Sequence, residues 1–174
     1  HILEGWDHLL FVIALVLLLR QWRRAVVAAT AFTVAHSITL AGASLGYLAM
    51  PQRPVEVLIA LSIVFLAVEI ARRDPERPSL AMRLPWVVAF LFGLLHGFGF
   101  AGALAEIGLP DDALVPALVA FNLGVEAGQL LVVAVTLAVI AAVSRLALSR
   151  LEPALRIASY VIGITGAYWL VDRL

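Results

Sequence analysis

The sequence predicts an all-α fold of the polytopic membrane class, a helix bundle with six transmembrane helices. Two observations predict it. Hydrophobic residues make up 63% of the chain, whereas a typical soluble domain has about 45–50% apolar residues. These residues also gather in long runs, and about 20 apolar residues are enough for a helix to cross the roughly 30 Å hydrocarbon core of a bilayer. We therefore interpret residues 1–174 as a single transmembrane domain.

The apolar runs are separated by short linkers rich in charge and proline, as expected of loops outside a bilayer. The first run ends at Arg20, the second at Pro51, the third at Arg72 and the fourth at Pro110. The fifth run is 30 residues long, so its helix must tilt, bend or protrude from the membrane. The expected helices cover, approximately, residues 2–19, 25–50, 55–71, 86–108, 114–143 and 154–171.

A weak internal similarity predicts that the first three and the last three helices form an inverted repeat. Residues 31–33 read Ala-Phe-Thr and residues 120–122 read Ala-Phe-Asn, and the first and fourth helices each carry a histidine near the middle. A repeat with an odd number of spans reverses its orientation in the membrane, and many transporters are built in this way.

The distribution of arginine predicts the orientation of the bundle. Ten of the twelve cationic residues lie after the first, third and fifth helices, and only Arg53 and Arg173 lie on the opposite side, together with Asp111 and Asp112. Loops rich in arginine stay in the cytoplasm. Both termini are therefore expected outside, which agrees with an even number of spans.

Charge and cysteine content exclude several classes of function. The formal net charge is zero and no cysteine is present. There is accordingly no basic surface for nucleic acid, and neither disulfides nor thiolate metal ligands are available. The expected partners are the lipid bilayer and a small ion. Self-association, or membership of a larger membrane complex, stays open.

Four ionisable residues on four different helices are expected at one depth. Ionisable side chains in hydrocarbon are costly and usually functional. His8, His36 and His96 lie roughly 15–18 Å from the cytoplasmic ends of their helices, and Glu126 lies roughly 18 Å from the outer end of its helix, at about 1.5 Å per residue. A single histidine is as easily explained by a hydrogen bond between helices, but the shared depth favours a common site, to which the neighbouring Asp7 also belongs.

Other polar residues are placed around this site as supporting groups or as parts of a pathway. Asn122 and Gln129 fall within about 60° of Glu126 on their helix, at 100° per residue. Glu69 lies near a helix end, where pairing with arginine and a role at an inner gate are both open. The residues assigned to this second group are His1, Glu4, Thr33, Ser37, Glu69, Asn122 and Gln129.

The ligand types narrow the choice of ion. Imidazole with carboxylate suits Ni²⁺, Co²⁺, Zn²⁺ or Cu²⁺, whereas Mg²⁺ and Ca²⁺ prefer sites made entirely of oxygen. The two methionines, Met50 and Met82, lie at loops, which argues against a Cu(I) path. The spacing alone does not separate Ni²⁺ from Co²⁺ or Zn²⁺.

Four segments resemble the HupE/UreJ family of hydrogenase and urease accessory membrane proteins, which are regarded as nickel permeases. They are residues 1–11 (HILEGWDHLLF), 32–40 (FTVAHSITL), 92–101 (FGLLHGFGFA) and 121–129 (FNLGVEAGQ). The resemblance implies Ni²⁺ import across the bacterial inner membrane for hydrogenase or urease maturation. Residues 4–8 (EGWDH) depart from the His-Pro and Glu-Asp-His pattern of the better-known members. They are closer to a second branch, which often has a preceding extracytoplasmic region.

The interpretation favoured by the sequence is therefore a non-enzymatic permease with a midplane metal site. The site residues are Asp7, His8, His36, His96 and Glu126. Two alternatives remain open. One is a structural subunit of a larger membrane complex that transports nothing. The other is an intramembrane metal-dependent hydrolase, since such ligands also suit hydrolysis, although the sequence contains no His-Glu-x-x-His motif.

Overall fold

The computed structural model describes residues 4–107, 111–146 and 148–174, with the side chains of residues 5–102, 114–146 and 151–174. His1 and the side chains of Glu4, Asp111 and Asp112 therefore lie outside the described residues. Every secondary-structure element in the described part of the chain is an α-helix. These are α1 (Glu4–Leu19), α2 (Trp22–Ser44), α3 (Gln52–Ala71), α4 (Leu80–Arg83), α5 (Pro85–Ile107), α6 (Asp111–Leu146) and α7 (Leu148–Asp172).

The predicted fold class is confirmed. Among the described residues, α2, α3, α5, α6 and α7 are long and apolar enough to cross a membrane, and α1 is a shorter apolar helix. The single turn α4, in the linker between α3 and α5, was not expected from the sequence. The protein is thus a polytopic helical membrane bundle.

Several helix ends differ from the expected positions. The second helix stops at Ser44 instead of about residue 50, because Gly46 has a φ of 78° and the amide groups of Tyr47 and Leu48 bond back to the carbonyl of Gly42. Such a left-handed glycine closes a helix, and the apolar residues that follow it hid this signal. The last two helices are also longer than expected. Helix α6 extends beyond residues 114–143 at both ends, and α7 begins before Pro153, which was expected to lie in the preceding linker.

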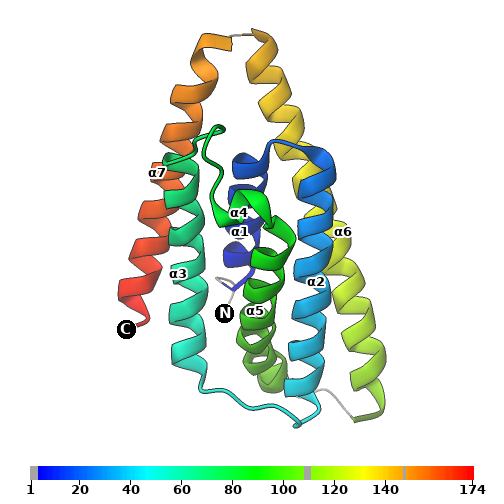
Figure 1. Ribbon diagram of the computed structural model, residues 1–174. Coiled ribbons are helices and arrows are strands. Elements are labelled where there is room, and N and C mark those ends of the chain that lie inside the picture. Colours follow the sequence, from blue (N-terminus) through cyan, green and yellow to red (C-terminus); the bar gives the residue numbers. More distant parts are fainter. Residues whose placement is uncertain (1–3, 108–110, 147) are drawn as a thin grey trace.

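Helix α1 is the centre of the bundle, with α3 and α7 on one side and α2 and α6 on the other (Figure 1). It contacts α2, α3, α5, α6 and α7. Its side chains are buried almost continuously from Phe11 to Leu19. A helix enclosed by others need not match the full thickness of the bilayer, which explains how its 16 residues suffice.

Helices α2 and α5 form the closest helix pair, and glycine permits it. A Cβ atom added to Gly97 would overlap the Thr39 hydroxyl and the His36 carbonyl oxygen, and one added to Gly93 would overlap the Phe32 carbonyl oxygen. Small residues in this spacing let membrane helices approach closely. Gly124 and Gly128 of α6 have the same spacing. A Cβ atom added to either would have nothing within 4 Å, so these two glycines pack against no described neighbour.

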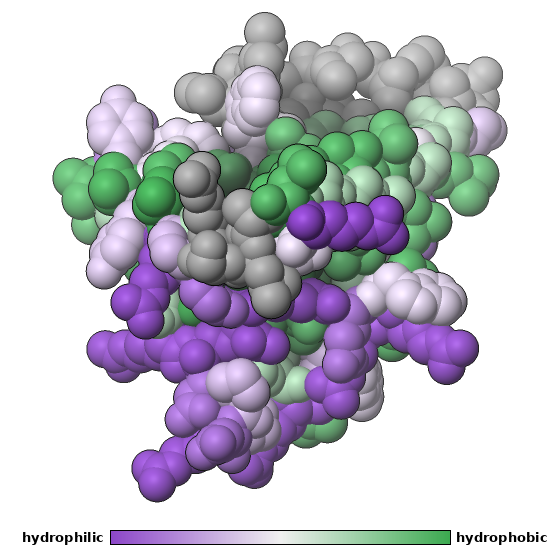
Figure 2. All heavy atoms as spheres, turned by 90° about the horizontal axis from the view of Figure 1, so that it is seen from above, coloured by the Kyte–Doolittle hydropathy of each residue, from purple (hydrophilic) through white to green (hydrophobic). Residues whose placement is uncertain are grey.

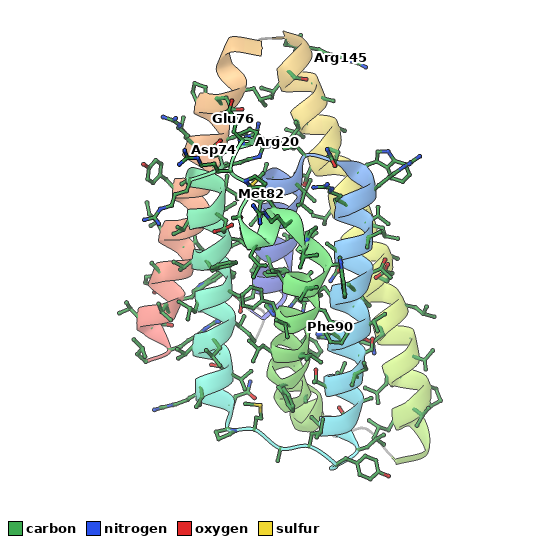
Figure 3. The ribbon with its side chains drawn as sticks, viewed as in Figure 1. Arg20, Asp74, Glu76, Met82, Phe90 and Arg145 are labelled. Carbon is green, nitrogen blue, oxygen red and sulfur yellow. The ribbon has the colours of Figure 1, made fainter. Side chains whose placement is uncertain are left out.

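The arginine-rich connections lie at one end of the bundle, drawn at the top in Figure 1. Figure 3 shows Arg20 and Arg145 toward this end, and Figure 2 looks onto it and shows hydrophilic side chains gathered over one side. Arg20, which follows α1 with a φ of 53°, forms an ion pair of 2.6 Å with Glu152 of α7. Arg73 donates to the Leu18 carbonyl oxygen at 3.1 Å, so two cations cover the carboxyl end of α1.

Candidate functional site

Three histidines from three helices meet beside α1. The ring of His8 lies 5.1 Å from that of His36 on α2 and 4.8 Å from that of His96 on α5, edge to face in both cases. His36 and His96 are fully buried, and His8 is half-buried. The close packing of α2 on α5 brings the last two together, because Gly97 directly follows His96 and contacts the backbone of His36.

A hydrogen bond fixes which nitrogen atom of His96 carries the proton. The Nδ1 of His96 lies 2.8 Å from the Phe92 carbonyl oxygen, so it carries the proton and Nε2 carries the lone pair. The Nδ1 of His36 lies 3.4 Å from the Nε2 of His8. The Nε2 atoms of His36 and His96 are buried and have no hydrogen-bond partner among the described residues. A metal ligand needs such a nitrogen, with its lone pair free.

Aromatic rings surround the histidine cluster. Phe32 stacks on His36 with the planes 12° apart and meets His96 edge to face at 4.9 Å between centroids. Phe11 lies 5.3 Å from His96, and Phe100 lies 6.4 Å from His8. These rings keep water away from the buried imidazoles, so charges and dipoles near them interact more strongly than in water.

In this arrangement the imidazoles contact one another and do not converge on a point. Among the described residues, no group of three or more His, Asp or Glu side chains is placed to hold a metal ion. Two nitrogen ligands of one tetrahedral ion, at about 2.0–2.1 Å from it, are about 3.3–3.4 Å apart. The Nε2 of His8 and the Nδ1 of His36 are 3.4 Å apart, which is within this spacing.

Asp7 forms an ion pair that the sequence analysis did not anticipate. Its Oδ2 lies 2.9 Å from Nη2 of Arg173, and the side chains are 5% and 12% exposed. The guanidinium also donates to the Glu56 carbonyl oxygen at 3.3 Å and lies over the ring of Trp169, 5.6 Å from its centroid. Arg173 is therefore held by groups from α1, α3 and α7.

A polar cavity of about 390 Å³ leads to the histidine cluster from the end of the bundle opposite the arginine-rich connections. Asp7, His8, His96 and Arg173 line its inner part. We call it the vestibule, and its remaining lining residues are Gln52, Arg53, Glu56, Ile59, Gly99, Phe100, Asp172 and Leu174. The side chain of Gln52 spans its wall, because its Nε2 donates both to Glu56 at 2.9 Å and to the Gly99 carbonyl oxygen at 3.0 Å.

Glu126 does not share the vestibule with the histidines. Its Oε1 accepts a hydrogen bond of 2.7 Å from Thr30, and Glu126 lines a separate groove of about 520 Å³ between α2 and α6. The expected convergence of Glu126 on the histidines is therefore not seen, because it faces a different side of α2 from His36.

The other two predicted site residues of α6, Asn122 and Gln129, face α2 in the same way. Thr33 donates to Gln129 at 3.1 Å and Ser37 donates to Asn122 at 2.7 Å. Together with Thr30 and Glu126 they form a polar ladder between α2 and α6. Gln129 also reaches an apolar pocket of about 410 Å³ that His8 lines as well, so this residue, unlike Asn122, adjoins the histidine cluster.

Glu69 lies away from the cluster, where its carboxylate accepts a hydrogen bond from Ser79 in the α3–α4 connection. His1 and the side chain of Glu4 lie outside the described residues.

Sequence reasoning missed Arg173 and the lining of the vestibule. The signal for Arg173 was present, because a carboxylate within a membrane helix requires a cationic partner and few arginines lie on that side of the chain. Which arginine reaches Asp7 depends on α7 packing beside α1, and no local pattern reveals this packing.

The comparisons with known proteins give one match. No curated protein and no solved structure matches the chain. The family described as HupE / UreJ protein matches residues 1–173, which is essentially the whole sequence and includes each histidine of the cluster. The chain therefore belongs to the HupE/UreJ family of metal permease-like accessory membrane proteins.

Proposed function

We propose that this protein is a permease that carries a divalent transition-metal ion, foremost Ni²⁺, into the cytoplasm for hydrogenase or urease maturation. It would reside in the bacterial inner membrane with both termini outside. The observation that carries the proposal is the histidine cluster, in which three imidazoles from α1, α2 and α5 meet at the inner end of a polar vestibule.

The proposed path begins in the vestibule, where Glu56 and Asp172 offer carboxylates that attract a hydrated cation. Asp7 and His8 are the first ligands, and His36 and His96 replace further water molecules with neutral nitrogen. Imidazole is the ligand that Ni²⁺, Co²⁺ and Zn²⁺ have in common, and several ligands from different helices allow an ion to enter and to leave stepwise. Glu126 and the polar ladder would lie beside this path.

Metal binding by the purified protein in lipid nanodiscs tests the proposal directly. The parent protein is equilibrated with Ni²⁺ and its bound metal is measured, with Co²⁺ and Zn²⁺ as competitors. His36→Ala and His96→Ala should each lose most of the bound Ni²⁺, since each removes a buried nitrogen ligand. Ser62→Ala is the matched control, because this buried hydroxyl bonds only to the Ile59 carbonyl of its own helix in the described structure.

Uptake into proteoliposomes then separates a carrier from a binding protein. The parent and Ser62→Ala should accumulate Ni²⁺, and the two histidine variants should not. If the histidine variants bind and carry Ni²⁺ like the parent, the histidines serve only as packing and hydrogen-bonding groups. A structural subunit would then be the better interpretation.

A further inference from the structure

The vestibule of a proposed cation carrier contains a buried cation of its own. The guanidinium of Arg173 lies in the same cavity as His8 and His96, and its partner Asp7 directly precedes His8 in α1. A metal ion at the histidine cluster would face this positive charge across a site of low dielectric, where repulsion between like charges is strong.

We infer that Arg173 occupies the carboxylate of Asp7 while the site is empty, and that a divalent cation must displace it in order to bind. Arg173 is then an internal competitor of the transported ion and a residue that sets its affinity. This inference rests on the proposed function, because it assumes that the ion binds at Asp7 and the histidines.

The surroundings of Arg173 suit such an exchange. A buried carboxylate without a cation is costly, so Asp7 needs a positive partner both before and after the ion arrives. On leaving Asp7, the guanidinium retains the face of Trp169 and the Glu56 carbonyl oxygen, and it can also turn toward Asp172 or Glu56, which line the same cavity. Neither the empty nor the occupied state leaves the carboxylate unpaired.

The exchange also limits how tightly the ion is held. A carrier must bind its ion well enough to admit it and weakly enough to release it. A guanidinium that returns to Asp7 competes with the bound ion and assists its release. Removing Arg173 should therefore tighten binding, which is the opposite of what a merely structural ion pair predicts.

Equilibrium binding of Ni²⁺ to the protein in nanodiscs tests the inference. Arg173→Gln should bind Ni²⁺ at least about fivefold more tightly than the parent, within the usual range for coupling between sites. The control Arg53→Gln removes the same charge from the same cavity, but Arg53 is exposed and does not hold Asp7 in the described structure. It should change the affinity by less than about twofold, because exposed charges are screened.

Further variants distinguish the failure of the inference from a failure to fold. Asp7→Asn/Arg173→Gln carries no buried charge and should lose the gain in affinity. Arg173→Lys keeps the charge on a shorter side chain, so its affinity should lie between those of the parent and Arg173→Gln. If Arg173→Gln cannot be purified, Arg173→Lys decides the question, and binding no tighter than the parent overturns the inference.

The result also separates this inference from the proposed function. If the parent binds Ni²⁺, His96→Ala does not, and Arg173→Gln binds no more tightly than the parent or than Arg53→Gln, then the permease stands and the exchange is wrong. If none of the proteins, the parent included, binds a divalent cation, the proposed function fails and the inference fails with it.

Discussion

At the scale of single residues, the two ring nitrogens of His96 have different surroundings. Its Nδ1 is occupied by the carbonyl of Phe92, one turn earlier in the same helix, and its ring is clamped by Phe11 and Phe32. Nε2 has no hydrogen-bond partner among the described residues. A hydrogen bond on the other ring nitrogen fixes the tautomer and orientation in many metal sites. The same arrangement here favours an ion-binding histidine over one that only joins two helices.

A prediction at this scale concerns Glu126. Because it lies outside the vestibule, its substitution should affect Ni²⁺ uptake more than Ni²⁺ binding. Glu126→Gln keeps an oxygen for the Thr30 hydroxyl but removes the charge. Ni²⁺ binding at equilibrium should stay within about twofold of the parent, since Glu126 lies outside the vestibule and shares no partner with the histidines in the described structure. Uptake should slow by about tenfold, because a carboxylate beside the path raises the local concentration of cations. Parallel binding and uptake assays in one lipid preparation check this, and a loss of binding would instead make Glu126 a ligand.

The histidine cluster was accessible from the sequence, whereas its charged neighbours were not. Counting residues from the helix ends placed His8, His36 and His96 at one depth, and depth survives folding because an α-helix has a fixed rise. The side of a helix that meets a given neighbour is set by tertiary packing. For this reason the contact of Glu126 with Thr30 and the pairing of Asp7 with Arg173 could not be derived.

At the scale of the elements, the contact between α2 and α5 depends on glycine at two positions one turn apart. The backbone of α2 lies where a side chain on Gly93 or Gly97 would be. The two glycines of the α6 motif, Gly124 and Gly128, instead line the apolar pocket beside His8. The two pairs have the same spacing in the sequence, and spacing does not say what lies opposite.

These two motifs predict opposite responses to the same substitution. Gly97→Ala should separate α2 from α5 and destabilise the protein by about 1–3 kcal/mol, the usual cost of overpacking. Gly124→Ala should leave the stability within about 0.5 kcal/mol, as for substitutions without a close neighbour. Thermal unfolding in detergent measures both, and equal effects would mean that the close contact of α2 with α5 is absent in the membrane.

Helix boundaries were predictable where charge or proline marks them and less so where apolar residues continue past the end. The third helix ends at Ala71, just before Arg72, as the charged linker indicated. The second ends in an apolar stretch because of Gly46, and the last begins before Pro153, which was expected to lie in the linker. A hydropathy pattern records where a chain is apolar, and backbone conformation decides where a helix stops.

At the scale of the whole molecule, the absence of cysteine makes the orientation directly testable. No cysteine occurs in the chain, so a single introduced cysteine can be labelled without background. Tyr47→Cys, in the exposed connection between α2 and α3, should react with a membrane-impermeant maleimide from outside intact cells. Arg77→Cys, in the connection before α4, should react only after the membrane is opened, since arginine-rich loops stay inside. The reverse pattern would place both termini in the cytoplasm.

The inverted repeat stays a prediction. Helices α1–α3 and α5–α7 supply the required three helices each, with α4 in the linker between them. Superposition of the two halves about an axis in the membrane plane would establish it.

The two ion pairs between α1 and α7 have a mechanical consequence. Asp7–Arg173 and Arg20–Glu152 fasten the same two helices at opposite ends. If the Asp7–Arg173 pair separates, the Arg20–Glu152 pair still connects the other ends of α1 and α7, and α1 can tilt about that end. Asp7 and Arg20 are 13 residues apart, a lever of about 20 Å at 1.5 Å per residue. A tilt of α1 by about 10° around the Arg20 end would carry Asp7 about 3.5 Å, enough to part it from Arg173. A small rigid rotation would thus open one end of the bundle and keep the other closed.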